Sequence, residues 1–210
     1  MNKQLKLKAA IDYQEQGLSV IPIKHKDKKP RVKWKQYQEE KADKQRIEEW
    51  FSKYPNASIG IVTGEISDIA VIDIEKGGST DEYPPTVTAK TGGGGYHLYY
   101  RYPESGISNS TRTKELTDIR GDGGYVIAPP SMHPSGNQYE WIADFNDVDM
   151  KEFPLDSFTG GSEKNTKTDL SHELNREVPE GERNNTATKV AGHFFARTPR
   201  RRSPIRMGKL

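Results

Sequence analysis

Between residues 58 and 142 the sequence is a series of short segments rich in isoleucine, valine, threonine and tyrosine, separated by glycine, proline or aspartate. Such segments are typical of β-strands, and the residues between them favour turns. The expected strands cover residues 58–63, 69–74, 86–90, 96–102, 118–120, 124–128 and 139–142, and one more precedes them at 18–23. This region therefore has to fold around a β-sheet.

Two helices are expected near the start of the chain. Apolar residues recur at loosely helical spacing over residues 5–13, and the pattern stops at Gly17, a residue type that often follows the end of a helix. Asp43 is placed to cap a second helix, which carries Ile47 and ends near Pro55. Helices at the start and strands through the middle predict an α+β fold.

The amino-acid composition of the chain changes after about residue 144. The 210 residues are 32% hydrophobic and 30% charged, which is polar for a globular chain and predicts one core plus a flexible segment. We predict a catalytic domain over residues 1–150 and a linker over 151–180. A partial helical segment with a basic, disordered tail is expected over 181–210.

Composition excludes several classes of protein. The chain has no cysteine, which rules out disulfides and thiolate zinc sites and fits a cytoplasmic protein. The lysines at the N-terminus are not followed by an apolar segment, so no signal peptide is predicted, and no run approaches the roughly 20 apolar residues of a membrane helix. The net charge of +2 indicates no global basic field.

Basic residues nevertheless concentrate in one loop, over residues 24–35. Such a run is usually a solvated face, but here it lies between apolar segments, so a surface that contacts phosphates is an equal alternative. The residues that we predict to bind DNA in this loop are Lys28, Lys29, Arg31, Lys33, Trp34 and Lys35.

The strand at 69–74 leads into two acids, Asp73 and Glu75. Residues two apart on a strand share a face, so the two carboxylates are predicted to point the same way while Ile72 and Ile74 point into a core. Like charges side by side are unfavourable unless a cation lies between them, and Mg²⁺ or Mn²⁺ prefers such oxygen ligands. The alternative is a solvated strand end with two ordinary acids.

Four consecutive glycines precede the strand that carries His97. Glycines let backbone N–H groups approach an anion closely, and a histidine at this point can donate a hydrogen bond to a phosphate oxygen. The alternative is a flexible hairpin with a half-buried histidine. The residues that we predict to contact phosphate in this motif are Lys90, Thr91, Gly94, Gly95 and His97.

A third motif covers residues 117–131. Asp118 and Arg120 alternate onto one face of a strand, where Asp118 supplies a third carboxylate and Arg120 neutralises phosphate charge. Asp122 lies between glycines and is predicted to be a turn residue. The stiff segment that follows ends in Ser131, a candidate donor to a ligand.

In this order, the motifs resemble the bifunctional DNA primase/polymerase N-terminal domain, the prim-pol branch of the archaeo-eukaryotic primase superfamily. The resemblance runs from about residue 9 to 141. It rests on residues 17–23, 29–30, 34, 47–50, 55–64, 71–75, 91–100 and 118–131. The family implies an RRM-like catalytic module packed with a smaller α/β module, built on mixed or antiparallel sheets.

The resemblance also implies roles and partners. Asp73, Glu75 and Asp118 match the catalytic carboxylates that hold two Mg²⁺ or Mn²⁺ ions, and His97 matches the histidine that contacts the nucleotide's phosphates. The resemblance implies template-directed nucleotidyl transfer, with single-stranded DNA template, primer and NTP or dNTP as substrates. It also implies plasmid or phage replication as the setting and a replicative helicase as a further partner. A metal-dependent nuclease and a non-catalytic module that binds single strands or an origin are the alternatives.

The sequence departs from the family at three points. Family members often carry serine two residues before the histidine, where this chain has Gly95, so we expect a backbone donor instead. The cysteine-liganded zinc element of some members is impossible here. The arginine-rich end departs from the helical region that often follows the domain, which suggests truncation or an altered reading frame.

Overall fold

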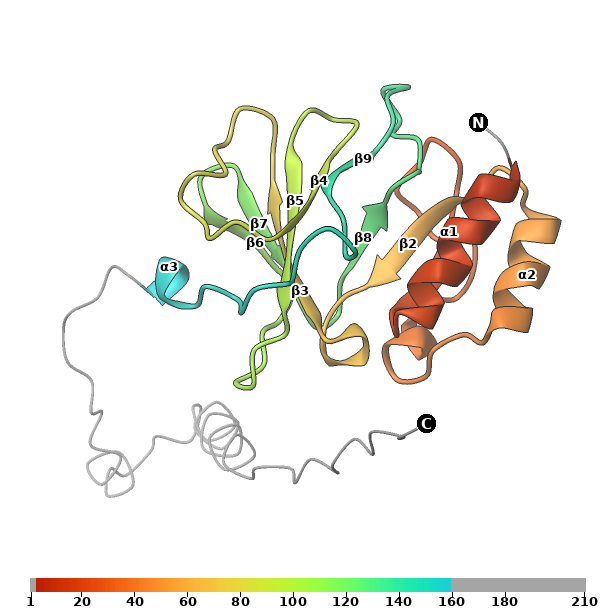
Figure 1. Cartoon of the computed structure of the whole chain (residues 1–210), viewed down its shortest axis with the longest axis horizontal. Coiled ribbons are helices and arrows are strands. Elements are labelled where there is room, and N and C mark those ends of the chain that lie inside the picture. The colour runs from red at the N-terminus through yellow and green to blue at the C-terminus, as the bar shows by residue number, and fades with distance from the viewer. Residues whose placement is uncertain (1–2, 160–210) are drawn as a thin grey trace, which may run out of the picture. The chain divides into compact units, whose positions relative to one another are not determined.

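The structure is a computed structural model that describes residues 3–159; the rest of the predicted linker and the predicted helical segment lie outside the described residues. The α+β prediction is confirmed (Figure 1). The helices are α1 (Lys3–Glu15), α2 (Lys44–Lys53) and α3 (Asp156–Thr159), with 3₁₀ turns η1 (Lys35–Gln38) and η2 (Glu65–Ser67). The strands are β1 (Ser19–Ile23), β2 (Ser58–Val62), β3 (Ile69–Ile74), β4 (Val87–Lys90), β5 (Tyr96–Arg101), β6 (Ser110–Lys114), β7 (Thr117–Arg120), β8 (Tyr125–Ala128) and β9 (Glu140–Ala143).

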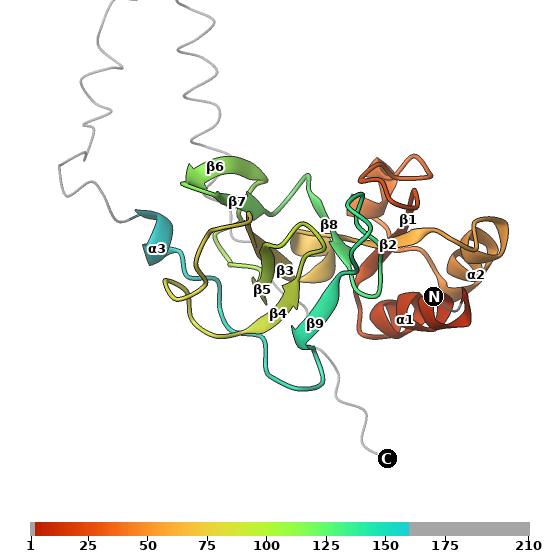
Figure 2. The same cartoon turned by 90° about the horizontal axis from the view of Figure 1, so that it is seen from above.

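The smaller of two sheets has the strand order β1-β2-β8, and both of its pairs are antiparallel. Helices α1 and α2 pack against β1 and against each other (Figure 2). The five residues of β1 and the five of β2 are all buried, as expected for strands that are covered on both faces. This sheet and its helices form an α/β unit.

The larger sheet has the order β6-β7-β3-β5-β4-β9 and is antiparallel throughout its named pairs. β3 lies inside this sheet, between β5 and β7 (Figure 2). Because β3 has a neighbour on each edge, its side chains face partners from two other strands. This position decides which polar groups meet in the candidate site.

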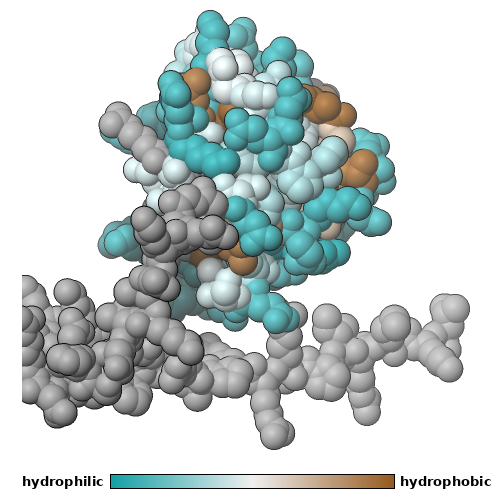
Figure 3. All heavy atoms as spheres, turned by 90° about the vertical axis from the view of Figure 1, so that its left-hand side faces the viewer, coloured by the Kyte–Doolittle hydropathy of each residue, from teal (hydrophilic) through white to brown (hydrophobic). Residues whose placement is uncertain are grey.

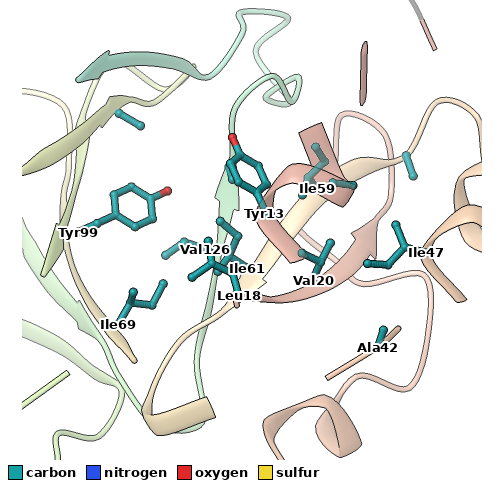
Figure 4. Packing of buried hydrophobic residues seen from close by; sticks show 14 of the residues in the cluster. Tyr13, Leu18, Val20, Ala42, Ile47, Ile59, Ile61, Ile69, Tyr99 and Val126 are labelled. Carbon is teal, nitrogen blue, oxygen red and sulfur yellow. The ribbon is translucent and has the colours of Figure 1, made fainter. Parts of the chain in front are cut away.

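The two faces of β3 pack into different cores. Ile69 and Val71 join the cluster that also contains the residues of α1, α2 and β2, where Ile61 and Tyr99 are fully buried (Figure 4). Ile72 and Ile74 join a second cluster on the opposite face, as the sequence predicted. Asp73 therefore lies on the same face as Ile69 and Val71, beyond the edge of the first cluster.

The predicted cap of α2 is confirmed. Asp43 has extended backbone, and its carboxylate accepts a hydrogen bond of 2.7 Å from the Arg46 N–H. We expect Asp43→Ala to lower the free energy of unfolding by about 1 kcal/mol, because one N–H of the first turn loses its acceptor. Urea denaturation measures this change, and Asp43→Ser, which keeps an acceptor, is the matched control. Equal stability of the alanine variant and the wild-type protein would contradict the capping role.

The chain continues to pack onto the larger sheet after residue 150. The Arg101 N–H donates to the Lys151 carbonyl, and Phe153 is buried against Tyr100. Residues 151–158, which we predicted as the start of the linker, thus lie against the domain in the structure. The surface on this side is mainly hydrophilic, with hydrophobic atoms in small, separate groups (Figure 3). Within residues 3–159, no helix is long and apolar enough to cross a membrane.

Candidate active site

Three adjacent strands bring the main predicted site residues into one row. Asp73 of β3 is paired with His97 of β5 on one side and with Asp118 of β7 on the other. Residues directly opposite each other in neighbouring strands point to the same face of a sheet. The register therefore assembles an imidazole and two carboxylates from segments that are far apart in the sequence.

Arg120 lies between the two carboxylates. Its Nη2 donates to Asp118 Oδ2 at 2.6 Å and to Asp73 Oδ2 at 3.1 Å, and its Nε lies 3.3 Å from the same Asp73 oxygen. The three side chains are between 14% and 25% exposed, so water screens these charges only in part. The guanidinium thus offsets the repulsion that two acids at this separation would otherwise exert.

His97 completes the row from the other side. Its Nε2 lies 3.4 Å from Asp73 Oδ1, and the residue is only 5% exposed. Its Nδ1 is buried and makes no hydrogen bond to any residue within the described range. The ring packs near Tyr99 and Tyr139, with centroid distances of 6.2 and 5.9 Å.

The surroundings of Asp73 keep it ionised. Burial alone would raise the pKa of the Asp73 carboxyl, but His97 and Arg120 beside it outweigh the burial and hold this pKa well below its usual range. Asp73 is therefore a carboxylate at any pH at which the protein is expected to work. An ionised, partly buried carboxylate of this kind is suited to binding a cation.

The row opens into a cavity of about 250 Å³. Its lining combines Asp73, His97 and Arg120 with residues from the basic loop and from the β7–β8 region. The other lining residues are Lys28, Asn109, Gly123, Gly124, Tyr125, Val126, Ile127 and Tyr139. Asn109, Tyr125 and Tyr139 were not singled out from the sequence, because nothing in their spacing shows that they face this cavity.

A larger groove of about 950 Å³ lies over other residues, among them Tyr83, Leu98 and Ile142. Leu98 is on the face of β5 opposite to His97, and none of the predicted site residues lines this groove. We therefore place the active site in the smaller cavity, where the charged groups converge.

Comparison with known proteins identifies the family of the chain. A family model described as bifunctional DNA primase/polymerase, N-terminal, matches residues 10–156. The chain belongs to this prim-pol family. Membership supports DNA primase/polymerase-type nucleotidyl transfer, with DNA and nucleotides as substrates. No curated protein sequence matches the chain.

Prim-pol enzymes generally depend on divalent metal, and two residues here fit such an ion. Asp73 and Asp118 each direct a carboxylate oxygen at the Arg120 guanidinium, a cationic group that lies between them. Glu75 is exposed just past the end of β3, where its N–H donates to the Leu116 carbonyl, and it does not line the cavity. Among the described residues, no three acids or histidines are grouped to hold a metal.

The glycine run of the prim-pol domain forms a tight turn beside this row. The Gly94 N–H donates to the Thr91 carbonyl and the Gly95 N–H to Thr91 Oγ1, so both predicted backbone donors are used within the turn. A Cβ on Gly95 would lie 2.0 Å from the Ile74 carbonyl oxygen, which explains why this chain has no serine there. Lys90 is exposed at the end of β4, opposite Tyr96.

Ser131 is not brought to the cavity. It is fully buried, and its Oγ accepts a hydrogen bond of 2.8 Å from the Ile59 N–H. This contact ties the segment after β8 to β2. Ser131 therefore positions the small sheet, and its hydroxyl does not face a ligand.

The basic loop divides into an inner and an outer part. Lys28 lines the cavity, and its carbonyl accepts a hydrogen bond from the Tyr125 hydroxyl. The Tyr125 ring also contacts the Trp34 ring, at a centroid distance of 4.8 Å. The Arg31 guanidinium lies 4.9 Å from the centre of the Tyr54 ring. Outside the cavity lining, the remaining predicted DNA contacts are exposed, namely Lys29, Lys33 and Lys35.

Proposed function

We propose that this protein is a template-directed DNA primase or DNA polymerase that works by a two-metal mechanism with Mg²⁺ or Mn²⁺. One observation supports this most directly: Asp73 is paired with Asp118 across β3 and β7 and shares Arg120 with it, and Asp73, Arg120 and His97 line one cavity with Lys28. Paired carboxylates next to phosphate-binding groups are the arrangement that phosphoryl transfer requires.

In this proposal, Asp73 and Asp118 hold the cations, with Glu75 approaching from the end of β3. Bound divalent ions supply Lewis acidity, which activates a 3′-hydroxyl and neutralises charge on the phosphates. Arg120 leaves the carboxylates and donates to the triphosphate, as a guanidinium binds phosphate oxygens well. His97 donates to the same phosphates and fixes their position relative to the carboxylates.

The DNA contacts follow from the basic loop. Lys28 lines the cavity, and Lys29, Lys33 and Lys35 of the same loop are exposed, so a template or primer strand that enters the cavity would meet the positive charge of this loop. We propose single-stranded template and primer as partners, NTP or dNTP as substrates, and a replicative helicase as a further partner. Plasmid or phage replication is the setting that we propose.

A primer-extension assay tests the proposal. Labelled primer–template is incubated with nucleotides and either Mg²⁺ or Mn²⁺, and we expect the primer to lengthen only when metal and nucleotide are both present. Shortening of the primer would indicate a nuclease, and DNA binding without turnover would indicate a non-catalytic module; either result would overturn the proposal. A parallel reaction without primer, on varied single-stranded templates, distinguishes priming from extension.

A further inference from the structure

The glycine turn leaves two backbone donors without a protein acceptor. Gly92 and Gly93 are the central residues of the turn that the Gly94 N–H closes onto the Thr91 carbonyl. Among the residues that the structure describes, neither the Gly92 nor the Gly93 N–H donates to an acceptor. Gly93 is exposed, and its N–H is a candidate donor to an anion.

A second loop is fastened onto this turn. The Gly92 carbonyl accepts hydrogen bonds from Ser135 Oγ at 2.8 Å and from Asn137 Nδ2 at 3.1 Å. A Cβ on Gly92 would lie 2.4 Å from the Cβ of His133, so glycine at this position allows the two loops to touch. The loop of residues 132–138 is thereby held against the turn that leads into β5 and His97.

His133 is oriented by this contact. Its Nδ1 accepts a hydrogen bond of 3.1 Å from the Ser135 N–H, so the proton of the neutral ring lies on Nε2, which makes no hydrogen bond within the described part of the chain. Nε2 lies beside Gly93, 3.4 Å from the position that a Cβ on this glycine would take. An imidazole N–H and a free backbone N–H are thus side by side at the surface of the turn.

His133 and His97 are connected through one aromatic ring. Tyr139 lies 5.8 Å from the His133 ring centre and 5.9 Å from that of His97, and it lines the active-site cavity. Burial lowers the pKa of the His133 imidazole, and the charge of Lys28, which lines the cavity, lowers this pKa further. One ring, that of Tyr139, therefore lies between His133 and the histidine of the carboxylate row, and Lys28 is near both the cavity and His133.

We propose that His133 Nε2 and the Gly93 N–H bind a phosphate group of the incoming nucleotide's triphosphate, as a subsite next to that of His97. The inference rests on the proposed function, since it assigns a further positioning residue to the same reaction. A triphosphate held at the carboxylates by one end would extend past His97 toward the turn, because β5 runs directly from the turn to His97. Backbone N–H groups and an imidazole N–H are suited to its oxygens.

Tripolyphosphate without divalent metal is the first probe, with binding measured by calorimetry on the full chain. We expect His133→Ala to weaken binding about tenfold and His133→Gln, which retains a side-chain donor, to weaken it less. His25→Ala, an exposed histidine of the basic loop that does not line the cavity, is the matched control and should bind as wild type. Thermal melting verifies that each variant is folded.

Two further readouts separate a phosphate contact from a structural role. In NMR titrations, tripolyphosphate should raise the pKa of the His133 imidazole despite the Lys28 charge and the Tyr139 ring beside it, because phosphate stabilises the imidazolium. In primer extension, His133→Ala should raise KM for the nucleotide about tenfold and change kcat little. An unchanged pKa, or equal binding by the alanine variant, would overturn the inference.

The outcomes also distinguish the ligand and the parent proposal. If His133→Ala weakens binding of single-stranded DNA but not of tripolyphosphate, the phosphate belongs to DNA and the inference is wrong. If the wild-type protein extends primers while the variant's KM is unchanged, the inference fails and the polymerase proposal stands. If tripolyphosphate binding depends on His133 in a protein that extends nothing, the phosphate subsite stands and the polymerase proposal fails.

Discussion

Replacing Asp73 with alanine is expected to reduce nucleotide incorporation about 1,000-fold or more. Asp73 contacts both Arg120 and His97, and it lies at the centre of the row formed by β5, β3 and β7. Its removal deletes an ionised carboxylate from the cavity and also releases His97 and Arg120, the two groups that we propose to position the triphosphate. Catalysis that depends on metal binding and on orientation loses both.

Single-turnover primer extension with saturating Mn²⁺ measures the effect. The domain should remain folded, because the Asp73 side chain is partly exposed beyond the edge of the first core cluster and Arg120 keeps its contact with Asp118. Thermal melting checks this point. Asp81→Ala is the matched control, because Asp81 lines the larger groove of about 950 Å³ and not the active-site cavity. Its backbone N–H, which the substitution keeps, makes the local contact with Ser79 Oγ. Activity within tenfold of wild type in Asp73→Ala would remove Asp73 from the catalytic role.

Much of the fold could be predicted from local sequence. The β3 segment is bounded by turn residues and is apolar except at Asp73, so residues two apart could be assigned to one face each before the partners of the strand were known. Gly17 adopts a positive φ of 87° after α1, and Asp43 caps α2, both for local reasons. Such features depend on a few neighbouring residues and carry their own signal.

Elements that depend on a pairing or packing partner, and whose own sequence carries no pattern, could not be predicted in this way. β6 has the sequence STRTK, which shows no apolar alternation, and it forms because it pairs with β7. The short α3 follows a segment that packs through Phe153 against the larger sheet. A polar strand at the edge of a sheet reads as a loop when its partner is unknown.

The same distinction applies to the site. Asp73, His97 and Asp118 could be identified as residues, but their adjacency depends on the register of three strands. Tyr139 faces the cavity and links two histidines only because of how the loop before β9 returns to the glycine turn. Ser131, by contrast, has the residue type of a ligand donor but is used to hold Ile59.

Arg120→Ala is expected to affect metal binding and catalysis in opposite directions. In the structure the guanidinium occupies the carboxylate oxygens that a cation would need, at 2.6 Å from Asp118 and 3.1 Å from Asp73. Any cation that binds this pair must displace Arg120 and lose the attraction that it supplied. Without the guanidinium, the protein alone should bind Mn²⁺ roughly tenfold more tightly, while incorporation falls about 100-fold because the triphosphate loses a donor.

Free Mn²⁺ observed by electron paramagnetic resonance gives the affinity, and primer extension gives the rate. Arg120→Lys retains the charge but cannot donate to both carboxylates in the same way, so its Mn²⁺ affinity should fall between those of wild type and alanine. Arg101→Ala is the control, because Arg101 makes only long contacts of 3.9 and 3.8 Å with exposed acids. Unchanged Mn²⁺ affinity in Arg120→Ala would show that the guanidinium and the cation do not compete. Tighter Mn²⁺ binding together with slower incorporation would mean that Arg120 competes with the metal and binds the triphosphate. A triphosphate that draws Arg120 away from the carboxylates would then strengthen metal binding, so the two ligands are coupled thermodynamically.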